Sequence, residues 1–272
     1  MVVGLVSVVV YVLIMISILR YRKSDPALRS SFFTLILAQS VPAIILYLVS
    51  AGFVRPRKYG LIHFEPRIHS EMARFSYYAQ AVSRSALLIC FLIIALNRFT
   101  AVQMPMQFAT IWKGKTIGIA VLASWLISIS FVTPIFYQAH ANFSWVPNGN
   151  LGGLALIMNQ DMVEKNRISS AIVECSVALP CLILYPYSIG YVVLRAPRKG
   201  GRKDDVLLLV SAAVSCSTLF FVMLCKIFAW TVADIKDASL KSISSDLWFF
   251  ASMTFPHISL DQISVSPSTI KI

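Results

Sequence analysis

Two residues of opposite charge lie inside stretches of the sequence that are otherwise apolar. Arg84 falls within the run 75–96, and Glu174 falls within the run 168–193. An arginine embedded in hydrocarbon is costly, by at least ~2.5 kcal/mol on insertion scales, and such a residue marks a functional site whose partner is to be found. The chemistry that this pair offers is an ion pair or a binding site for a polar ligand.

The two residues are also predicted to lie at similar depth in a membrane. By helical rise Arg84 lies ~20 Å before Asn97, and Glu174 lies ~9 Å below the start of its own run. Both therefore fall in the outer part of the bilayer if the amino terminus is outside. We expect an outer ligand cavity that contains Arg84 and Glu174. The alternative is a structural ion pair that serves packing and binds no ligand.

A further arginine ends the run 75–96, in the sequence Asn97-Arg98-Phe99, and Pro105 follows seven residues after it. A guanidinium is always charged and offers five donors, so Arg98 can bond to neighbouring helices or to the backbone carbonyls of a partner when the helices move apart. Because Asn97 is not acidic, no local ion pair restrains Arg98. The alternative is an interfacial side chain that snorkels to water.

Histidine and glutamate gather between the second and third apolar runs, at His63, Glu65, His69 and Glu71. Their spacings match no zinc pattern and no cysteine joins them, so we expect a solvated loop rather than a metal site. We expect no cofactor. The sequence has neither clustered His, Asp or Cys ligands nor a Ser/His pair at matched depth, so we do not expect an enzyme.

The composition places these residues in a membrane protein. Hydrophobic residues make up 57% of the 272 residues and charged residues 13%, which is too apolar for a soluble domain of this length. The net charge of +12 is spread over the ends of apolar runs and does not form one basic face, so we expect no nucleic-acid partner. We expect the lipid bilayer to surround the chain.

Apolar windows of about 20 residues predict the membrane helices, because that length crosses ~30 Å of hydrocarbon. We expect an all-α, multi-spanning transmembrane helix bundle of the seven-helix receptor type with a short or incomplete seventh helix, in one domain (1–260) followed by a short polar tail (261–272). The predicted spans are 2–19, 32–54, 75–96, 116–136, 168–193, 206–228 and the shorter 247–260.

The flanking charges predict which end of the bundle is outside. The first span has no basic residue before it and Arg20, Arg22 and Lys23 directly after it, which favours an outside amino terminus. This orientation exposes the sequon at Asn142, where we expect glycosylation. The five cysteines all fall within predicted spans, so we expect no extracellular disulfide.

The residues around Arg98 resemble a known receptor motif. Rhodopsin-like seven-helix receptors carry Asp-Arg-Tyr at the inner end of the third helix, a proline shortly afterwards and a tryptophan in the fourth helix, and Asn97-Arg98-Phe99, Pro105 and Trp125 fit those spacings. The stretch 96–102, continuing through Pro105 to Ile111-Trp112-Lys113, is more similar still to nematode serpentine chemoreceptors of class gamma (Srg) or the related class V (Srv).

The resemblance implies a G-protein-coupled chemosensory receptor in the plasma membrane of sensory cells. It would bind an unknown chemical ligand in the outer half of the bundle and signal to a heterotrimeric G protein. It implies that Asn97, Arg98, Phe99 and Pro105 couple to the G protein, with Trp125 and Pro180 in structural positions of the fourth and fifth spans. The alternative function is a small membrane transporter or channel subunit that uses Arg84 and Glu174 in its pathway.

Overall fold

The computed structural model describes most of the chain as far as residue 195. The described residues are 2–24, 26–54, 66–136, 143–148, 153–158 and 160–195, together with Pro56, Ser217, Phe220, Phe221, Leu224, Ile227 and Phe228. They fall into two compact units. The first comprises Met1–Phe91 and Gly114–Val173, and the second comprises Leu92–Lys113 and Glu174–Ile272.

The first unit begins with a helix that matches the first predicted span. Helix α1 (Val2–Tyr21) is apolar until Arg20 and carries no acidic residue in its first turn. The 3-10 turn η1 (Pro26–Arg29) follows, with Pro26 at its first position, where a proline fits because no backbone N–H is needed there. Helix α2 then begins at Ser31, so the connection between α1 and α2 is short.

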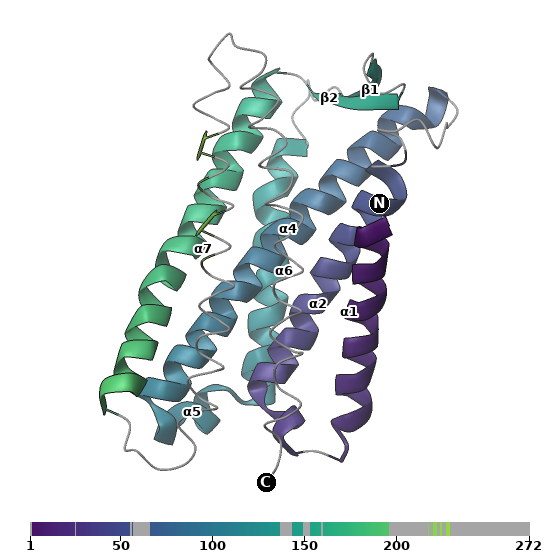
Figure 1. Cartoon of the computed structure of the whole chain (residues 1–272). Coiled ribbons are helices and arrows are strands. Elements are labelled where there is room, and N and C mark those ends of the chain that lie inside the picture. The colour runs from purple at the N-terminus through teal and green to yellow at the C-terminus, as the bar shows by residue number, and fades with distance from the viewer. Residues whose placement is uncertain are drawn as a thin grey trace. The chain divides into compact units, whose positions relative to one another are not determined.

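Helix α2 (Ser31–Val49) runs beside α1 and also packs against α6 (Gly114–Phe136) (Figure 1). It continues without a break into the π-helical segment η2 (Ser50–Val54), so that the two together cover the predicted span 32–54. Pro42 lies inside α2 and is fully buried. A proline within a membrane helix is tolerated where neighbouring helices and local adjustments satisfy the backbone that it frees.

The longest helix is α4 (Pro66–Gln103), with 38 residues. The apolar window predicted only 75–96, because hydropathy reports the part of a helix that lies in lipid and not the turns that continue into water. Proline fixes the far end of α4. Pro105 disfavours the α conformation at Met104, whose φ of −129° and ψ of 56° leave the helix. Helix α5 (Pro105–Ile111) then starts at the proline itself.

A contact between small buried side chains joins α4 and α6 in the first unit. Ser83, Ala86 and Cys90 of α4 are buried, as are Ser124 and Ser128 of α6. The Cys90 Sγ lies 3.7 Å from the Ser124 Oγ. Small residues let two helix backbones approach closely, which is the usual means of helix association in membranes.

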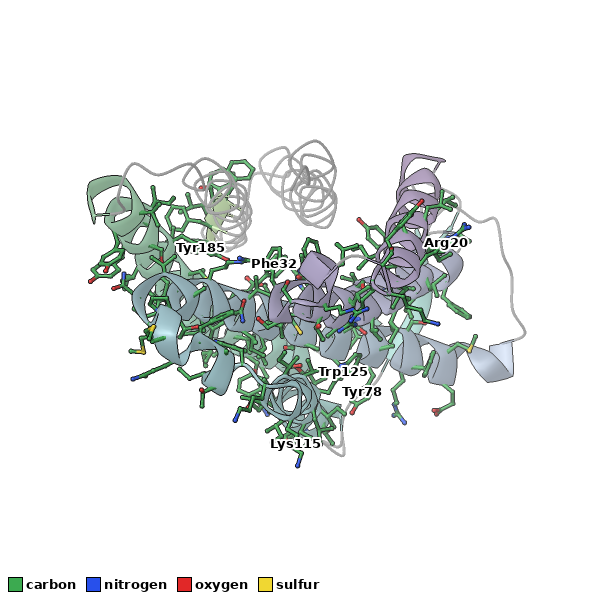
Figure 2. The ribbon with its side chains drawn as sticks, turned by 90° about the horizontal axis from the view of Figure 1, so that it is seen from below. Arg20, Phe32, Tyr78, Lys115, Trp125 and Tyr185 are labelled. Carbon is green, nitrogen blue, oxygen red and sulfur yellow. The ribbon has the colours of Figure 1, made fainter. Side chains whose placement is uncertain are left out.

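A polar contact joins the same two helices nearer the end where α4 begins. The Tyr78 and Thr133 hydroxyls share a hydrogen bond of 2.9 Å, and Thr133 directly precedes Pro134, a proline within α6. Figure 2 shows Tyr78 beside α6, together with Trp125. Within the first unit, α4 and α6 therefore meet at two levels, at Cys90–Ser124 and at Tyr78–Thr133.

The connection after α6 contains a β-hairpin, which the all-α prediction did not anticipate. Strand β1 (Phe143–Asn148) pairs antiparallel with β2 (Gly153–Met158), from Phe143↔Met158 to Asn148↔Gly153. Figure 1 shows the hairpin at the end of the first unit where α4 begins. Phe, Trp and Val in β1 favour a strand. The hairpin adds to the predicted helical bundle and does not replace it.

Helix α7 (Gln160–Arg195) covers the fifth predicted span and starts before it, with Pro180 and Pro186 inside. In the part of the chain that the structure describes, four helical segments are long and apolar enough to cross a membrane, namely Ser31–Val54, Glu71–Gln103, Gly114–Pro134 and Ile168–Val192. The described positions of the sixth predicted span, Ser217 to Phe228, are helical. The seventh predicted span and the predicted tail lie outside the described residues.

Candidate functional site

The sequence Asn97-Arg98-Phe99 lies inside α4 and not at its end. Sequence analysis placed Arg98 where the helix leaves the bilayer, two residues after the predicted end at Leu96, but α4 continues to Gln103. Asn97 is completely buried, with an exposed fraction of 0%, and Arg98 is half-buried. A neutral amide costs far less to bury than a carboxylate. Position 97 is therefore a core position, for which asparagine is better suited than an acid.

An aromatic contact joins this part of α4 to α7 within the second unit. The rings of Phe99 and Tyr187 have centroids 5.9 Å apart and are inclined by 44°. This separation lies in the range in which aromatic pairs attract one another. Phe99 follows Arg98 directly, so a contact to α7 holds the turn of α4 that carries the guanidinium.

A second contact fixes the same turn to the connection that follows α4. The indole Nε1–H of Trp112 donates a hydrogen bond of 2.6 Å to the Oγ1 of Thr100. The Thr100 hydroxyl in turn lies within donating distance of two carbonyl oxygens of its own helix, those of Leu96 at 2.9 Å and Asn97 at 3.0 Å. Since a hydroxyl has one proton and two lone pairs, Thr100 can donate and accept at once.

Backbone hydrogen bonds complete the turn between α4 and α5. The Met104 N–H donates to the Thr100 carbonyl at 2.9 Å, and the Phe108 N–H donates to the Met104 carbonyl at 2.9 Å. Phe108 and Trp112 are half-buried, whereas the Met106 side chain is 94% exposed. Pro105 therefore begins a short, well-anchored helix that presents one face to its surroundings.

The structure describes both residues of the predicted outer cavity but does not test their pairing. Arg84 lies on α4 in the first unit and is half-buried. Glu174 lies on α7, is 4% exposed, and is the first α7 residue of the second unit. A carboxylate buried to this degree needs polar or charged company. The ligand cavity thus remains a prediction.

The remaining predicted residues have simpler outcomes. Trp125 is half-buried on α6 (Figure 2), and Pro180 is half-buried within α7. Asn142 of the sequon lies outside the described residues, immediately before β1. Within the part of the chain that the structure describes, Cys90, Cys175 and Cys181 are not joined in disulfides. Among the described residues no group of three or more His, Cys, Asp or Glu side chains has a geometry suited to a metal ion.

Sequence reasoning treated the basic residues after α1 only as signals of orientation, but two of them hold the chain in place. The Arg29 guanidinium donates from Nε to the Arg22 carbonyl at 2.9 Å and from Nη2 to the Lys23 carbonyl. The Arg22 Nη2 donates to the Thr34 Oγ1 at 2.8 Å. These bonds hold the connection between α1 and α2 against the end of α1. The sequence did contain a signal for these bonds, because an arginine within a few residues of a helix end can donate to the last carbonyls of that helix.

Comparison with known protein families gives one match over almost the whole chain. The model of the family described as serpentine type 7TM GPCR chemoreceptor Srv matches residues 1–253. A search among curated proteins finds no match. The matched region contains all the residues discussed above, including the α4 turn with Arg98 and both residues of the predicted outer cavity.

Proposed function

The chain belongs to the Srv family of serpentine seven-transmembrane chemoreceptors, and on that premise we propose that it is a chemosensory receptor that activates a heterotrimeric G protein. It is an integral membrane protein of a receptor family. The proposal adds three things: a location in the plasma membrane of sensory cells, a chemical ligand that binds in the outer half of the bundle, and a G-protein contact at the inner end of α4.

The observation that supports G-protein coupling is the double attachment of the α4 turn that carries Arg98. Phe99 contacts Tyr187 on one side, and Thr100 accepts the indole N–H of Trp112 on the other. Arg98 directly precedes Phe99 and Thr100 and is half-buried. The Trp112 attachment does not depend on α7, so it can still orient Arg98 when α4 and α7 separate, and the planar donors of the guanidinium can then bind backbone carbonyls of an inserted partner helix. Asn97 and Pro105 position this group from within α4 and from the start of α5.

The same contacts suggest how a ligand would act. A ligand shifts a two-state equilibrium only if it binds one state more tightly than the other. The Phe99–Tyr187 contact joins two different helices, so it exists in full only in the arrangement of α4 and α7 described here. A second arrangement in which these helices separate would lose that contact and make Arg98 more accessible. Arg84 and Glu174 are the groups that we propose for the ligand.

The test of coupling needs no known ligand, because a receptor that exchanges between two states shows some activity without one. The purified chain in lipid nanodiscs is mixed with a panel of heterotrimeric G proteins, and basal nucleotide exchange is measured. We expect Arg98→Ala to lower exchange to the rate seen with empty nanodiscs. Arg98→Lys should recover only part of it, because lysine lacks the planar set of donors.

The matched control is Lys113→Ala, which removes an exposed basic residue of the same unit that the proposal does not use. It should leave exchange unchanged. Thermal unfolding of each variant in detergent separates loss of coupling from loss of fold. The proposal fails if Arg98→Ala keeps the wild-type exchange rate, or if no G protein of the panel responds to the wild-type chain.

A further inference from the structure

One face of α1 exposes apolar side chains in a line that ends on a basic residue. Val9, Leu13 and Ile16 are each more than half exposed, at 57%, 56% and 53%. Spacings of four and three residues put them on the same side of the helix, and Arg20 follows four residues later on that side. From Val9 to Arg20 the helix rises ~16 Å, about half of the ~30 Å hydrocarbon layer.

The basic residues at the end of α1 are of two kinds. Arg29 and Arg22 donate hydrogen bonds to protein oxygens, as described above. Arg20 and Lys23 are exposed, as is Arg29. Within the described residues neither Arg20 nor Lys23 forms an ion pair with a carboxylate, and the ion pair seen there is Arg74–Glu71. Tyr21, between them, is 58% exposed. Exposed tyrosine beside basic side chains is typical of the bilayer interface.

We propose that this surface, which we call the α1 lipid face (Val9, Leu13, Ile16, Arg20 and Lys23), binds a phospholipid with an anionic headgroup. The headgroup contacts Arg20 and Lys23, and an acyl chain lies along Ile16, Leu13 and Val9. The match in length supports this occupant, because the apolar line covers one leaflet and ends where the charges begin. Arg29 supports the site indirectly, since it holds the backbone of Lys23 in place.

Charge favours an anionic lipid over a second copy of the chain. Two copies that met through this face in one membrane would share the same orientation and depth, so the Arg20 and Lys23 side chains of both would meet. Four cations close together repel one another. An anionic headgroup neutralises them, and basic residues near a membrane surface each contribute ~1 kcal/mol to the attraction of acidic lipids. A zwitterionic headgroup offers no net charge for this.

Photo-crosslinking tests the site directly. The full-length chain is placed in nanodiscs that contain either phosphatidylserine or phosphatidylcholine with a photoreactive acyl chain, and cross-linked peptides are identified by mass spectrometry. We expect the serine lipid to label peptides of α1 more than the choline lipid does. Arg20→Gln combined with Lys23→Gln should lower this preference by roughly 30-fold, which is two residues at ~1 kcal/mol each.

Matched variants keep the result interpretable. Lys113→Gln combined with Lys115→Gln removes two exposed basic residues near the start of α6 and should leave the α1 preference unchanged. Arg20→Lys combined with Lys23→Arg keeps both charges and should retain it. In the wild-type chain, raising the salt concentration should weaken it through screening, whether or not the Gln variant folds.

Several outcomes would overturn the proposal. One is equal labelling of α1 by the two lipids in the wild-type chain, and another is a preference that salt does not change. A loss of preference in the Lys113 and Lys115 control as large as in the Arg20 and Lys23 variant would show that only total charge matters. Absence of lipid labelling on α1, with other helices labelled, would show that the face is covered by protein and not by lipid.

Discussion

Trp112 donates its indole N–H to the hydroxyl of Thr100 across 2.6 Å, and so ties the connection after α4 to a turn within α4. Thr100 also bonds to the carbonyl oxygens of Leu96 and Asn97. The hydroxyl thus links the Trp112 indole to two backbone carbonyls in the turn of α4 that carries Arg98. This contact gives the candidate coupling site a defined geometry at low cost, because threonine and its carbonyl partners are already neighbours in the helix.

Replacing Thr100 by valine, which has nearly the same shape, removes the acceptor and leaves the indole N–H unsatisfied. We expect the free energy of unfolding in detergent to fall by ~1 kcal/mol, the typical value of one intramolecular hydrogen bond. Thr100→Ser keeps the hydroxyl, so its free energy of unfolding should equal that of the wild-type chain within error. Fluorescence of Trp112, followed in a chain whose other tryptophans are replaced by phenylalanine, should shift in the valine variant alone. Equal stability of the valine and serine variants would contradict this contact.

The Phe99–Tyr187 contact predicts an interaction energy between two helices. Phe99→Leu, Tyr187→Leu and the double variant form a double-mutant cycle in which the unfolding free energy is measured. We expect a coupling of ~0.5–1.5 kcal/mol, as for other aromatic pairs. Because the pair exists only while α4 and α7 are close, each single variant should also raise basal G-protein nucleotide exchange. Tyr187→Phe, which keeps the ring, is the control. If the changes in unfolding free energy of the two single variants simply add in the double variant, the contact is ruled out.

The Arg29 hydrogen bonds predict local protection at the end of α1. Arg29→Gln removes a cation next to the last carbonyls of a helix, where a positive charge stabilises by up to ~1 kcal/mol. Amide exchange at Arg22, whose N–H donates to the Ile18 carbonyl at 2.9 Å, should accelerate about fivefold as a result. In the Arg29→Lys variant, the rate of amide exchange at Arg22 should lie between the rates of the Arg29→Gln variant and the wild-type chain. Exchange at the first turn of α2 serves as reference and should change less.

Arg84 and Glu174 carry the prediction of the ligand cavity, which a charge exchange can test. Removing one partner of a buried ion pair costs ~3–5 kcal/mol, because the other charge is left uncompensated. Arg84→Gln and Glu174→Gln should therefore each lower surface expression or ligand response, and Arg84→Glu combined with Glu174→Arg should recover expression. Recovered expression with a lost response indicates a ligand site. Recovery of both indicates a structural pair, and recovery of neither indicates that the two residues do not pair.

The sequence predicted the membrane helices well but not the ends of those helices. Apolar windows found the described spans because hydrophobicity averages over some twenty residues. Where a helix ends depends on single residues instead. Pro105 ends α4 through its effect on the backbone of Met104. At the other end, α4 continues through polar residues that the apolar window leaves out. Hydropathy is insensitive to both effects. The hairpin of β1 and β2 was missed because a two-stranded pairing depends on which residues face each other and not on composition.

The candidate site was predicted in its residues but not in its contacts. Arg98 and Pro105 stood out through charge and backbone restriction, which are properties of single residues. Thr100 and Trp112 lie on either side of the break at Pro105, so their hydrogen bond depends on the direction in which the chain turns there. Phe99 and Tyr187 come from separate predicted spans. Their contact depends on helix packing, which the residue pattern of one helix does not determine.

The length of α4 has a practical consequence. Its 38 residues rise about 57 Å, far more than the ~30 Å of hydrocarbon, and tilts of up to about 40° do not absorb the difference. We therefore expect the turns that begin at Pro66, with the exposed Glu71 and Arg74 pair, to extend into water as a stalk. If α1 and α2 both cross the membrane, as the sequence predicts, this segment and the amino terminus lie on the same side. A nanobody against this epitope, applied to intact cells, would read out the orientation of the receptor from a single rigid helix.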